Sequence, residues 1–208
     1  IAYISKNFKN LKEKCVGGYN LTCLGYNEKE FGCIFTKYEN NLCDKYLAQA
    51  YDVLKISYKK FSFLKRGSDE RQFNSPNVEL PIATVFKSKF GDFKEYHTSL
   101  DNFDIVTNEN IEKSFKLILK TIKIFQNNII PFAKFRCEPN MGKRGLYPLI
   151  SKSSKTKKLP FDIKIMMDFL QYSDGKNDLV DISKRLNITL KKSKNIFLAL
   201  KNKKLIEF

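Results

Sequence analysis

The stretch from Phe63 to Asp104 contains two polar blocks, LKRGSDERQF at residues 64–73 (block 1) and EYHTSLDNFD at residues 95–104 (block 2). Each block follows a short run rich in apolar, β-branched or aromatic residues, at residues 58–64 and 82–86. Runs of this kind predict buried strands. In an open α/β sheet, ligands bind in the loops at the carboxyl ends of the strands. The two blocks therefore form the candidate functional site.

Strand and helix patterns alternate before this stretch. The expected elements are a strand end at residues 1–4, a helix at 6–14, strands at 19–24 and 31–36, and a helix at 42–54 with Asn41 as its N-cap. Apolar residues three and four apart are typical of a helix with one buried face. The alternation predicts an α/β domain in which crossover helices cover a sheet.

A long helix follows block 2, and Thr107 is its expected N-cap. Its apolar residues recur at intervals of four and three, with lysines on the other face. The spacing predicts a buried stripe made of Ile111, Phe115, Ile118, Ile122 and Phe125. We expect this helix to close the first domain, followed by one further extended piece at residues 132–137.

The last part of the chain has a different pattern. Residues 151–158 contain no apolar side chain and predict a flexible linker, which we place at residues 151–160. We therefore assign residues 1–150 to the α/β domain. Residues 161–208 show three short helical patterns and an extended end, which is the outline of a winged helix.

The formal net charge of +16 raises the question of nucleic-acid binding. Residues 136–208 hold 17 Lys and Arg against 7 Asp and Glu, so the excess lies in the tail. Lys191, Lys192 and Lys194 at the start of the third helix could contact phosphates. A lysine-rich surface can also reflect an AT-rich genome, and winged helices also bind proteins. DNA and a partner protein both remain open as partners of this domain.

The composition indicates a globular protein, with 42% apolar residues, 18 Phe and 10 Tyr. No apolar run approaches the roughly 20 residues that cross a bilayer, so we expect no membrane partner. The five cysteines are an odd number without a C-x-x-C pair, which argues against a disulfide framework and a zinc knuckle. Reduced thiols predict a cytoplasmic protein. The chain begins at Ile1, and we expect it to be the carboxyl-terminal part of a longer protein.

Block 2 contains His97, the single histidine of the chain. A histidine among polar and acidic residues is a candidate metal ligand or general base. A lone histidine is more often an ordinary surface residue that hydrogen-bonds within a loop. Spacing alone leaves both interpretations open.

Four segments together resemble one bacterial family: residues 67–73, 96–102, 142–148 and 172–179. That family consists of aminopeptidase-like zinc proteins, often encoded beside polysaccharide-biosynthesis genes, that end in a winged-helix domain. More distantly, the segments are similar to the zinc aminopeptidase and glutaminyl cyclase superfamily. The resemblance covers most of the chain. It implies a three-layer aminopeptidase-like domain, present here in part, and a zinc-dependent hydrolase acting on a peptide or amino-acyl small molecule.

For block 2, the resemblance implies that His97 binds zinc through an imidazole nitrogen. Glu95 or Asp101 would orient the imidazole by accepting its other ring N–H, and the sequence does not choose between them. Because the chain contains one histidine, it would contribute one histidine to the metal site.

For block 1, the resemblance implies catalytic roles for Asp69, Glu70 and Arg71 beside the substrate pocket. The two carboxylates would bind a substrate ammonium or hold Arg71 in place. Arg71 would then bind a carboxylate or a tetrahedral oxyanion.

Two departures from the superfamily pattern limit these implications. Glu70 stands where the superfamily has histidine, and residues 19–24 offer Asn20 and Thr22 where related peptidases carry an aspartate ligand. One zinc is therefore expected, not two. The other ligands and the glutamate base would lie upstream of Ile1, so the upstream half of the same protein is an expected partner. The alternative is a non-catalytic binding or regulatory protein that contacts DNA or a protein through its winged helix.

Overall fold

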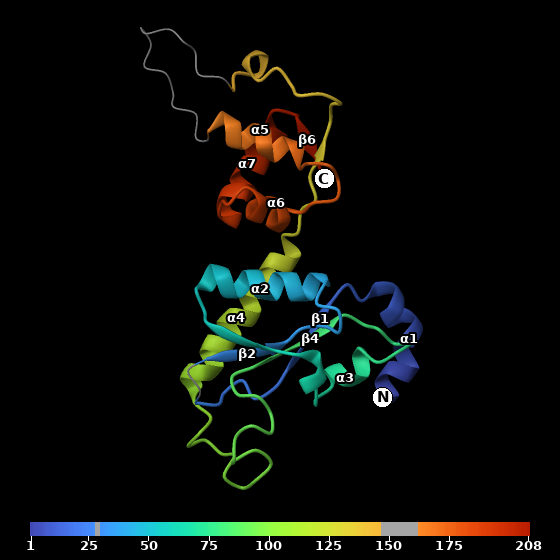
Figure 1. The fold of residues 1–208 in the computed structure, drawn as a ribbon, viewed down its shortest axis with the longest axis vertical. Coiled ribbons are helices and arrows are strands. Elements are labelled where there is room, and N and C mark those ends of the chain that lie inside the picture. The colour runs from blue at the N-terminus through green and yellow to red at the C-terminus, as the bar shows by residue number, and fades with distance from the viewer. Residues whose placement is uncertain (28–29, 147–161) are drawn as a thin grey trace. The chain divides into compact units, whose positions relative to one another are not determined.

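The computed structural model describes residues 1–27, 30–146 and 162–208 (Figure 1). The chain divides into two compact units, Ile1–Gln126 (unit 1) and Asn127–Phe208 (unit 2). The linker predicted at residues 151–160 lies outside the described residues.

Residues 127–146 belong to unit 2, whereas the sequence pattern assigned them to the first domain. β5 (Phe132–Ala133) pairs with β6 (Ile206–Glu207). Met141 and Leu146 are buried in the same apolar core as the helices of unit 2. Contacts between segments far apart in the sequence set this division, and the composition of a linker does not report such contacts.

Unit 1 is a mixed α/β domain built on a four-stranded sheet. The strands are β1 (Gly18–Leu21), β2 (Phe31–Ile34), β3 (Tyr58–Phe61) and β4 (Ile82–Phe86), in the order β1-β4-β2-β3. β1 is parallel to β4 and β2 is parallel to β3, but β2 runs antiparallel to β4. The predicted fold class is confirmed. β3 and β4 run in opposite directions. Blocks 1 and 2 therefore leave the sheet at opposite ends of its strands.

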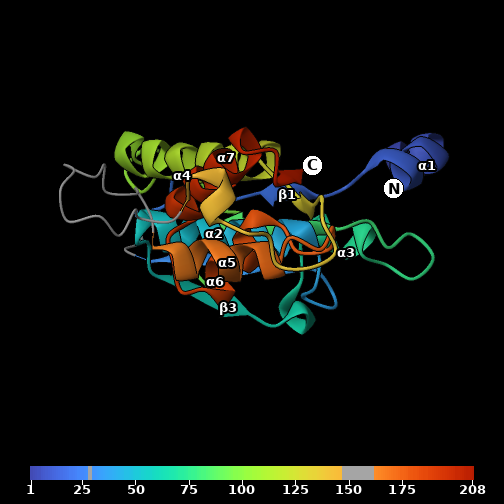
Figure 2. The same cartoon turned by 90° about the horizontal axis from the view of Figure 1, so that it is seen from above.

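Helices lie on both sides of this sheet, with α2 (Leu42–Leu54) above the strands and α3 (Glu70–Phe73) below them in Figure 1. α4 (Asn108–Gln126) packs against α2, and Figure 2 shows the two helices from above. The predicted cap of α2 is confirmed, because the Asn41 N–H donates to Asp44 Oδ2 at 3.2 Å. The chain therefore fixes the start of α2 through its own side chains.

The strand end predicted at residues 1–4 is wrong, because α1 (Ala2–Lys14) begins there. The Ser5 N–H donates to the Ile1 carbonyl at 2.9 Å, which is a helical bond. Ile4 is the buried residue of this helix, and Tyr3 and Phe8 are exposed. Among the described residues no strand pairs with this segment, so helix formation satisfies its backbone groups.

The long helix α4 is present as predicted, but a different face of it is buried. The buried positions are Asn110, Ser114, Leu117, Thr121 and Ile124. The predicted stripe begins one residue later, which turns it by about 100° around the axis. As a result Ile111, Phe115 and Ile122 are exposed. Small and polar side chains let α4 approach closely, and the Ser114 hydroxyl donates to the Leu24 carbonyl at 2.8 Å.

The described residues of unit 2 form three α-helices, α5 (Ile163–Gln171), α6 (Leu179–Arg185) and α7 (Leu190–Asn202), together with the β5–β6 pair. The Thr189 hydroxyl accepts from the Lys192 N–H at 3.2 Å and caps α7. The predicted winged-helix outline is confirmed. In the part of the chain that the structure describes, no helix has the length and apolar character needed to cross a bilayer.

Candidate functional site

Glu70 of block 1 is fully buried, and its carboxylate accepts four hydrogen bonds. Oε1 accepts from the backbone N–H groups of Gly67 and Ser68 at 2.8 and 3.1 Å. Oε2 accepts from Asn20 Nδ2 at 3.1 Å and from Thr84 Oγ1 at 2.9 Å. One side chain therefore ties the block 1 loop to β1 and β4.

Asn74 extends this network at the end of α3. Its Nδ2 donates to the carbonyls of Glu70 and Ile82 at 3.0 and 2.8 Å, and its Oδ1 accepts from the Lys37 N–H at 3.3 Å. Asn74 is also buried. Buried polar groups that are all paired hold a loop in one geometry. Glu70 and Asn74 thus fix α3 against the sheet.

Asp69 and Arg71 flank Glu70 and are both exposed. The predicted contact in which a carboxylate holds Arg71 is not seen, because no ion pair joins Arg71 to Asp69 or Glu70 among the described residues. Of the three predicted catalytic residues of block 1, the structure leaves these two open to a ligand and encloses Glu70.

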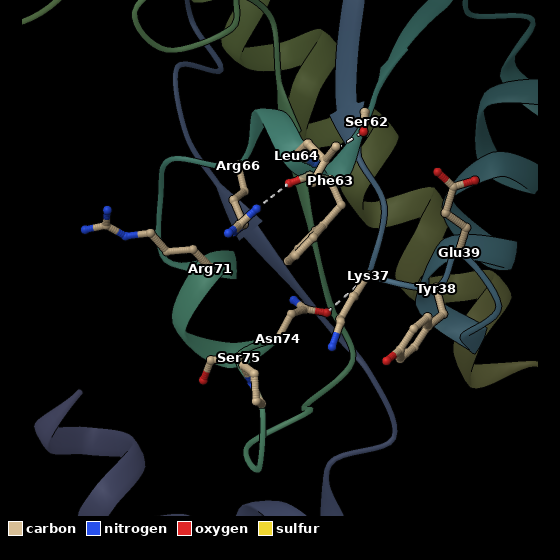
Figure 3. Close-up of a pocket in the computed structure, with 11 residues that line it drawn as sticks. Lys37, Tyr38, Glu39, Ser62, Phe63, Leu64, Arg66, Arg71, Asn74 and Ser75 are labelled. Atoms are coloured by element: carbon tan, nitrogen blue, oxygen red, sulfur yellow. Dashed lines mark hydrogen bonds between the residues drawn. The ribbon is translucent and has the colours of Figure 1, made fainter.

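Arg71 lies at a cavity of about 690 Å³, which Figure 3 shows in close-up. The cavity is lined by Lys37, Tyr38, Glu39, Ser62, Phe63, Leu64, Arg66, Arg71, Asn74, Ser75 and Pro76. These residues follow β2 and β3 and end α3. Figure 3 shows the Phe63 ring between Arg66 and Lys37, with the Arg71 side chain reaching outward.

Positive charge predominates in this cavity. Lys37, Arg66 and Arg71 line it, and the lining carboxylate, Glu39, accepts from Lys60 Nζ at 2.7 Å. The Arg66 guanidinium lies over the Phe63 ring, 5.2 Å from its centroid. A pocket with three cations, one neutralised carboxylate and aromatic walls suits a small molecule that carries an anionic group.

His97 of block 2 is exposed and lies in an irregular loop. Its backbone has φ of 59°, in the left-handed region that few residues other than glycine adopt. The imidazole stacks on the Tyr96 ring with centroids 4.0 Å apart and an interplanar angle of 18°. Within the described ranges, no hydrogen bond or ion pair engages the His97 side chain. Its ring nitrogens are therefore available to a ligand.

The two predicted orienting residues do not contact His97 in the described structure. Glu95 Oε2 accepts from the Tyr26 hydroxyl at 3.3 Å. Asp101 is exposed and lies near Cys23, whose thiol pKa is raised first by burial, with the Asp101 charge adding to the rise. A role for either carboxylate on the imidazole would require the loop to rearrange.

Blocks 1 and 2 both approach one aromatic cluster. Phe63, which borders block 1, and Tyr96 of block 2 both pack on the cluster that contains Phe86 and Phe90. A Cβ on Gly67 would lie 2.5 Å from the Phe90 ring, so block 1 touches the loop that leads to block 2. The aromatic cluster therefore lies against both blocks, although they leave the sheet at opposite ends of its strands.

The described residues do not form a metal centre by themselves. No group of three His, Cys, Asp or Glu side chains within residues 1–27, 30–146 and 162–208 could hold a metal ion. Asn20 and Thr22 stand where the sequence analysis looked for an aspartate, and Asn20 is engaged by Glu70. His97 is thus the single histidine that the chain can offer, and the described residues place no companion ligands beside it.

In unit 2, the candidate nucleic-acid residues differ in their exposure. Lys191 is exposed and Lys192 is half-buried at the first turn of α7. Lys194 Nζ donates to Asn127 Oδ1 at 2.8 Å, so part of its capacity is used within the unit. Lys191 and Lys192 are the two that the structure leaves available.

A family model described as a domain of unknown function, DUF4910, matches residues 1–128. The chain belongs to the DUF4910 family. A second model, described as a winged helix-turn-helix, matches residues 129–208. In this DUF4910 chain, the boundary between the two matched models lies within two residues of the division between units 1 and 2.

Two relatives of this DUF4910 chain come from Clostridium acetobutylicum. The chain is 34% identical over 199 residues to a "Putative polysaccharide biosynthesis protein with aminopeptidase-like domain", covering 93% of the chain and 44% of the relative. It is also similar to the crystal structure of a "putative peptidase" from that organism, with a TM-score of 0.79 and 29% identity over 99% of the chain. The chain spans 44% of that structure as well.

The sequence analysis assigned no role to two cations of the cavity, Lys37 and Arg66. Lys37 follows β2 and carries no motif, so its place in the cavity lining follows from the order of the strands. Arg66 stands within block 1, next to Gly67, and its position was a usable signal. A search for cations at the ends of neighbouring strands would have found it.

Proposed function

We propose that this chain forms part of an aminopeptidase-like hydrolase whose site is completed by residues outside the chain. The observation that carries the proposal is the likeness of 99% of the chain to a "putative peptidase" of which it spans only 44%. The substrate class that follows is a peptide or an amino-acyl small molecule, cleaved at an amide bond next to a free amino group.

Block 2 can supply one zinc ligand. The imidazole of His97 is exposed and makes no side-chain hydrogen bond within the described residues, so a nitrogen can bind a metal. A catalytic zinc takes three protein ligands and a water, and when bound it acts as a Lewis acid that activates this water. Because the described residues lack a group of three ligands, the other ligands and the general base belong to further residues of the polypeptide.

The cavity of block 1 serves the anionic end of the substrate in this proposal. Arg71 is free of ion pairs within the described chain, and Arg66 and Lys37 line the same pocket. A guanidinium binds a carboxylate or a tetrahedral oxyanion through parallel N–H donors. Asp69 is exposed beside them and can accept a substrate ammonium. Glu70 acts as a positioning residue, because it holds the Gly67 and Ser68 N–H groups.

A cytoplasmic location is part of the proposal. All five cysteines are free, and two of them, Cys33 and Cys43, are buried. Unpaired thiols are typical of a reducing compartment.

The first test measures zinc in the product of the complete gene that contains this chain, by elemental mass spectrometry. We expect about one zinc per chain, little or none on the 208-residue chain alone, and a loss of zinc in His97→Ala. Ser99→Ala, an exposed change two residues along the same loop, should keep the metal. A His97→Ala variant that retains its zinc would overturn the assignment.

The second test addresses the cavity with a pair of peptides, one with a free carboxyl terminus and one amidated. Arg71→Ala should raise KM for the free acid about tenfold or more, because a charge-assisted hydrogen bond contributes roughly 1.5–3 kcal/mol. The amidated peptide should be affected much less. An equal rise in KM for both peptides would show that this pocket does not bind the substrate carboxylate.

A second candidate function is DNA binding by unit 2, in a non-catalytic or regulatory protein. The observation that favours it is the match of residues 129–208 to a winged helix-turn-helix model, with Lys191 and Lys192 free at the start of α7. Phosphate contacts from lysine make affinity fall steeply with salt.

The test is a titration with duplex DNA at several salt concentrations. Replacing Lys191 and Lys192 by alanine should reduce the slope of log K against log salt by roughly two. Lys164→Ala, on α5 and paired with Asp168, is the matched control and should leave the slope unchanged. Binding that is absent or independent of salt would leave unit 2 as a protein-contact module.

A further inference from the structure

Helix α4 presents its more apolar side outward. The buried side consists largely of small or polar residues, namely Asn110, Ser114, Leu117, Thr121 and Ile124. The outward side carries the exposed Ile111, Phe115 and Ile122 and the half-buried Ile118, which we call the outer stripe. Ile111 is 47% exposed, Phe115 63% and Ile122 42%. An apolar stripe at this spacing is usually the buried face of a helix. In this chain the stripe is largely exposed instead.

The outer stripe is a continuous feature and not a set of scattered side chains. Its residues are four, three and four positions apart, which places them in one row along the helix. The charged residues Lys113 and Lys116 lie off this row and pair with Glu109 and Glu112. A contiguous apolar row bordered by charged residues marks an interaction surface, whereas isolated exposed apolar residues do not.

A second unpartnered feature adjoins the stripe. β1 is an edge strand and pairs on one side only, with β4, within the described sheet. α4 follows β1 along its length: Ser114 bonds the Leu24 carbonyl beyond one end of β1, and the Phe125 ring lies beside Gly17 at the other. Ile111 of the stripe lies against Gly25, just after β1. An open strand edge and an apolar helix row therefore belong to neighbouring elements.

The length of the relatives indicates what covers this surface. Both matched proteins are more than twice as long as the matched region, since the chain spans 44% of each. A sheet edge takes a further strand, and an apolar helix row takes a further helix. A strand and a helix from the same polypeptide satisfy both features together.

We propose that the outer stripe of α4 and the open edge of β1 are an internal interface, covered by the part of the polypeptide that lies outside this chain. The covering part adds a strand beside β1 and packs an apolar helix face on Ile111, Phe115, Ile118 and Ile122. The interface does not depend on zinc or hydrolysis, so it stands or falls separately from the proposed function.

The experiment compares thiol accessibility in the 208-residue chain and in the product of the complete gene. Phe115→Cys and Ile122→Cys place thiols on the stripe, and Lys116→Cys places one on the charged side as the matched control. Each protein is treated with N-ethylmaleimide, and the rate at each site is followed by peptide mass spectrometry. The positions are exposed, so the variants of the 208-residue chain should fold normally.

We expect the two stripe cysteines to react at least tenfold more slowly in the complete gene product than in the 208-residue chain, and Lys116→Cys to react equally in both. Equal rates on the stripe, or a gene product no longer than this chain, would overturn the proposal. Protection in the 208-residue chain that grows with protein concentration would assign the stripe to a second copy and would overturn it as well. Zinc content, measured on the same samples, reports the proposed function independently.

Discussion

Blocks 1 and 2 are both rich in polar and charged residues, but their key side chains differ in burial and in hydrogen bonding. Glu70 of block 1 is fully buried and accepts four hydrogen bonds, whereas His97 of block 2 is exposed and stacks on a single ring. Both blocks are polar clusters that follow strands. In the proposed function, the buried carboxylate of block 1 positions its loop and the exposed imidazole of block 2 meets a ligand, so burial distinguishes the two roles.

The consequence for Glu70 is chemical. A carboxylate held by four donors has no free site for a substrate, and moving a proton onto it would break bonds that fix the loop. Arg71 and His97 present open donors or acceptors at the surface instead. The proposed function accordingly assigns ligand contact to Arg71 and His97 and a supporting role to Glu70.

The largest effect is expected from Glu70→Ala. The change removes the carboxylate that accepts from the Asn20 and Thr84 side chains and releases the block 1 loop. Unsatisfied buried groups cost roughly 1–3 kcal/mol each, so the free energy of unfolding of unit 1 should fall by roughly 2–4 kcal/mol. Urea unfolding followed by tyrosine fluorescence measures this, since eight of the ten tyrosines lie in unit 1.

Asp69→Ala is the matched control for that measurement, because Asp69 is the exposed neighbour of Glu70. It should change the free energy of unfolding by less than about 0.5 kcal/mol. A Glu70→Ala variant as stable as Asp69→Ala would break the comparison, because the buried network would then carry no weight in folding.

Gly67→Ala should have the next largest effect. The added Cβ would lie 2.5 Å from the Phe90 ring, which belongs to the cluster between the two blocks. Overpacking of this kind costs roughly 1–3 kcal/mol. The same urea experiment measures it, with Ser68→Ala as a control that keeps the backbone donor to Glu70. A loss no greater than that of Ser68→Ala would show that the two blocks are not packed together as described.

His97→Ala should leave folding almost unchanged, within about 0.5 kcal/mol, because an exposed ring with one stacking contact adds little stability. Thermal and urea unfolding of the 208-residue chain measure this without metal. A loss above roughly 1.5 kcal/mol would make His97 a structural residue like Glu70 and would weaken its role as a ligand.

The smallest perturbation is thiol labelling, which tests the packing of the sheet around the blocks without mutation. Burial, with the Asp44 charge in second place, raises the pKa of the Cys33 and Cys43 thiols to about 12. Their thiolate fraction is then on the order of a thousandfold below normal. In the native protein at pH 8, the exposed Cys137 should react first and Cys23, beside block 2, more slowly. Cys33 and Cys43 should react only on unfolding, as mass spectrometry can follow; early labelling of either would contradict the packing.

Much of the fold could be predicted from local patterns. The helices at residues 42–54 and after Thr107, and the α/β class, follow from periodicity and capping residues, and the structure contains them. The buried face of α4 did not follow, because its polar residues are paired by distant groups such as the Leu24 carbonyl. A stripe that faces outward has the same sequence period as one that faces the core.

The site was predictable in its residue types and not in their arrangement. Block 1 and block 2 were identified as candidates, and the structure brings them to one aromatic cluster. The partners of Glu70 come from β1 and β4, and Lys37 reaches the cavity through the strand order. These contacts depend on tertiary structure that no local pattern encodes.

The pairing of β1 also dictates an order of events during folding. Asn20 of β1 and its neighbour Thr84 of β4 are 64 positions apart, whereas β2, α2 and β3 are consecutive along the chain. Closing a long loop costs more entropy than closing a short one, so β1 should join the sheet last. Pulse-labelled hydrogen exchange during refolding should show the amides of β1 becoming protected after those of β2 and β3. A nascent chain would thus carry β1 unpaired until most of unit 1 has been synthesised.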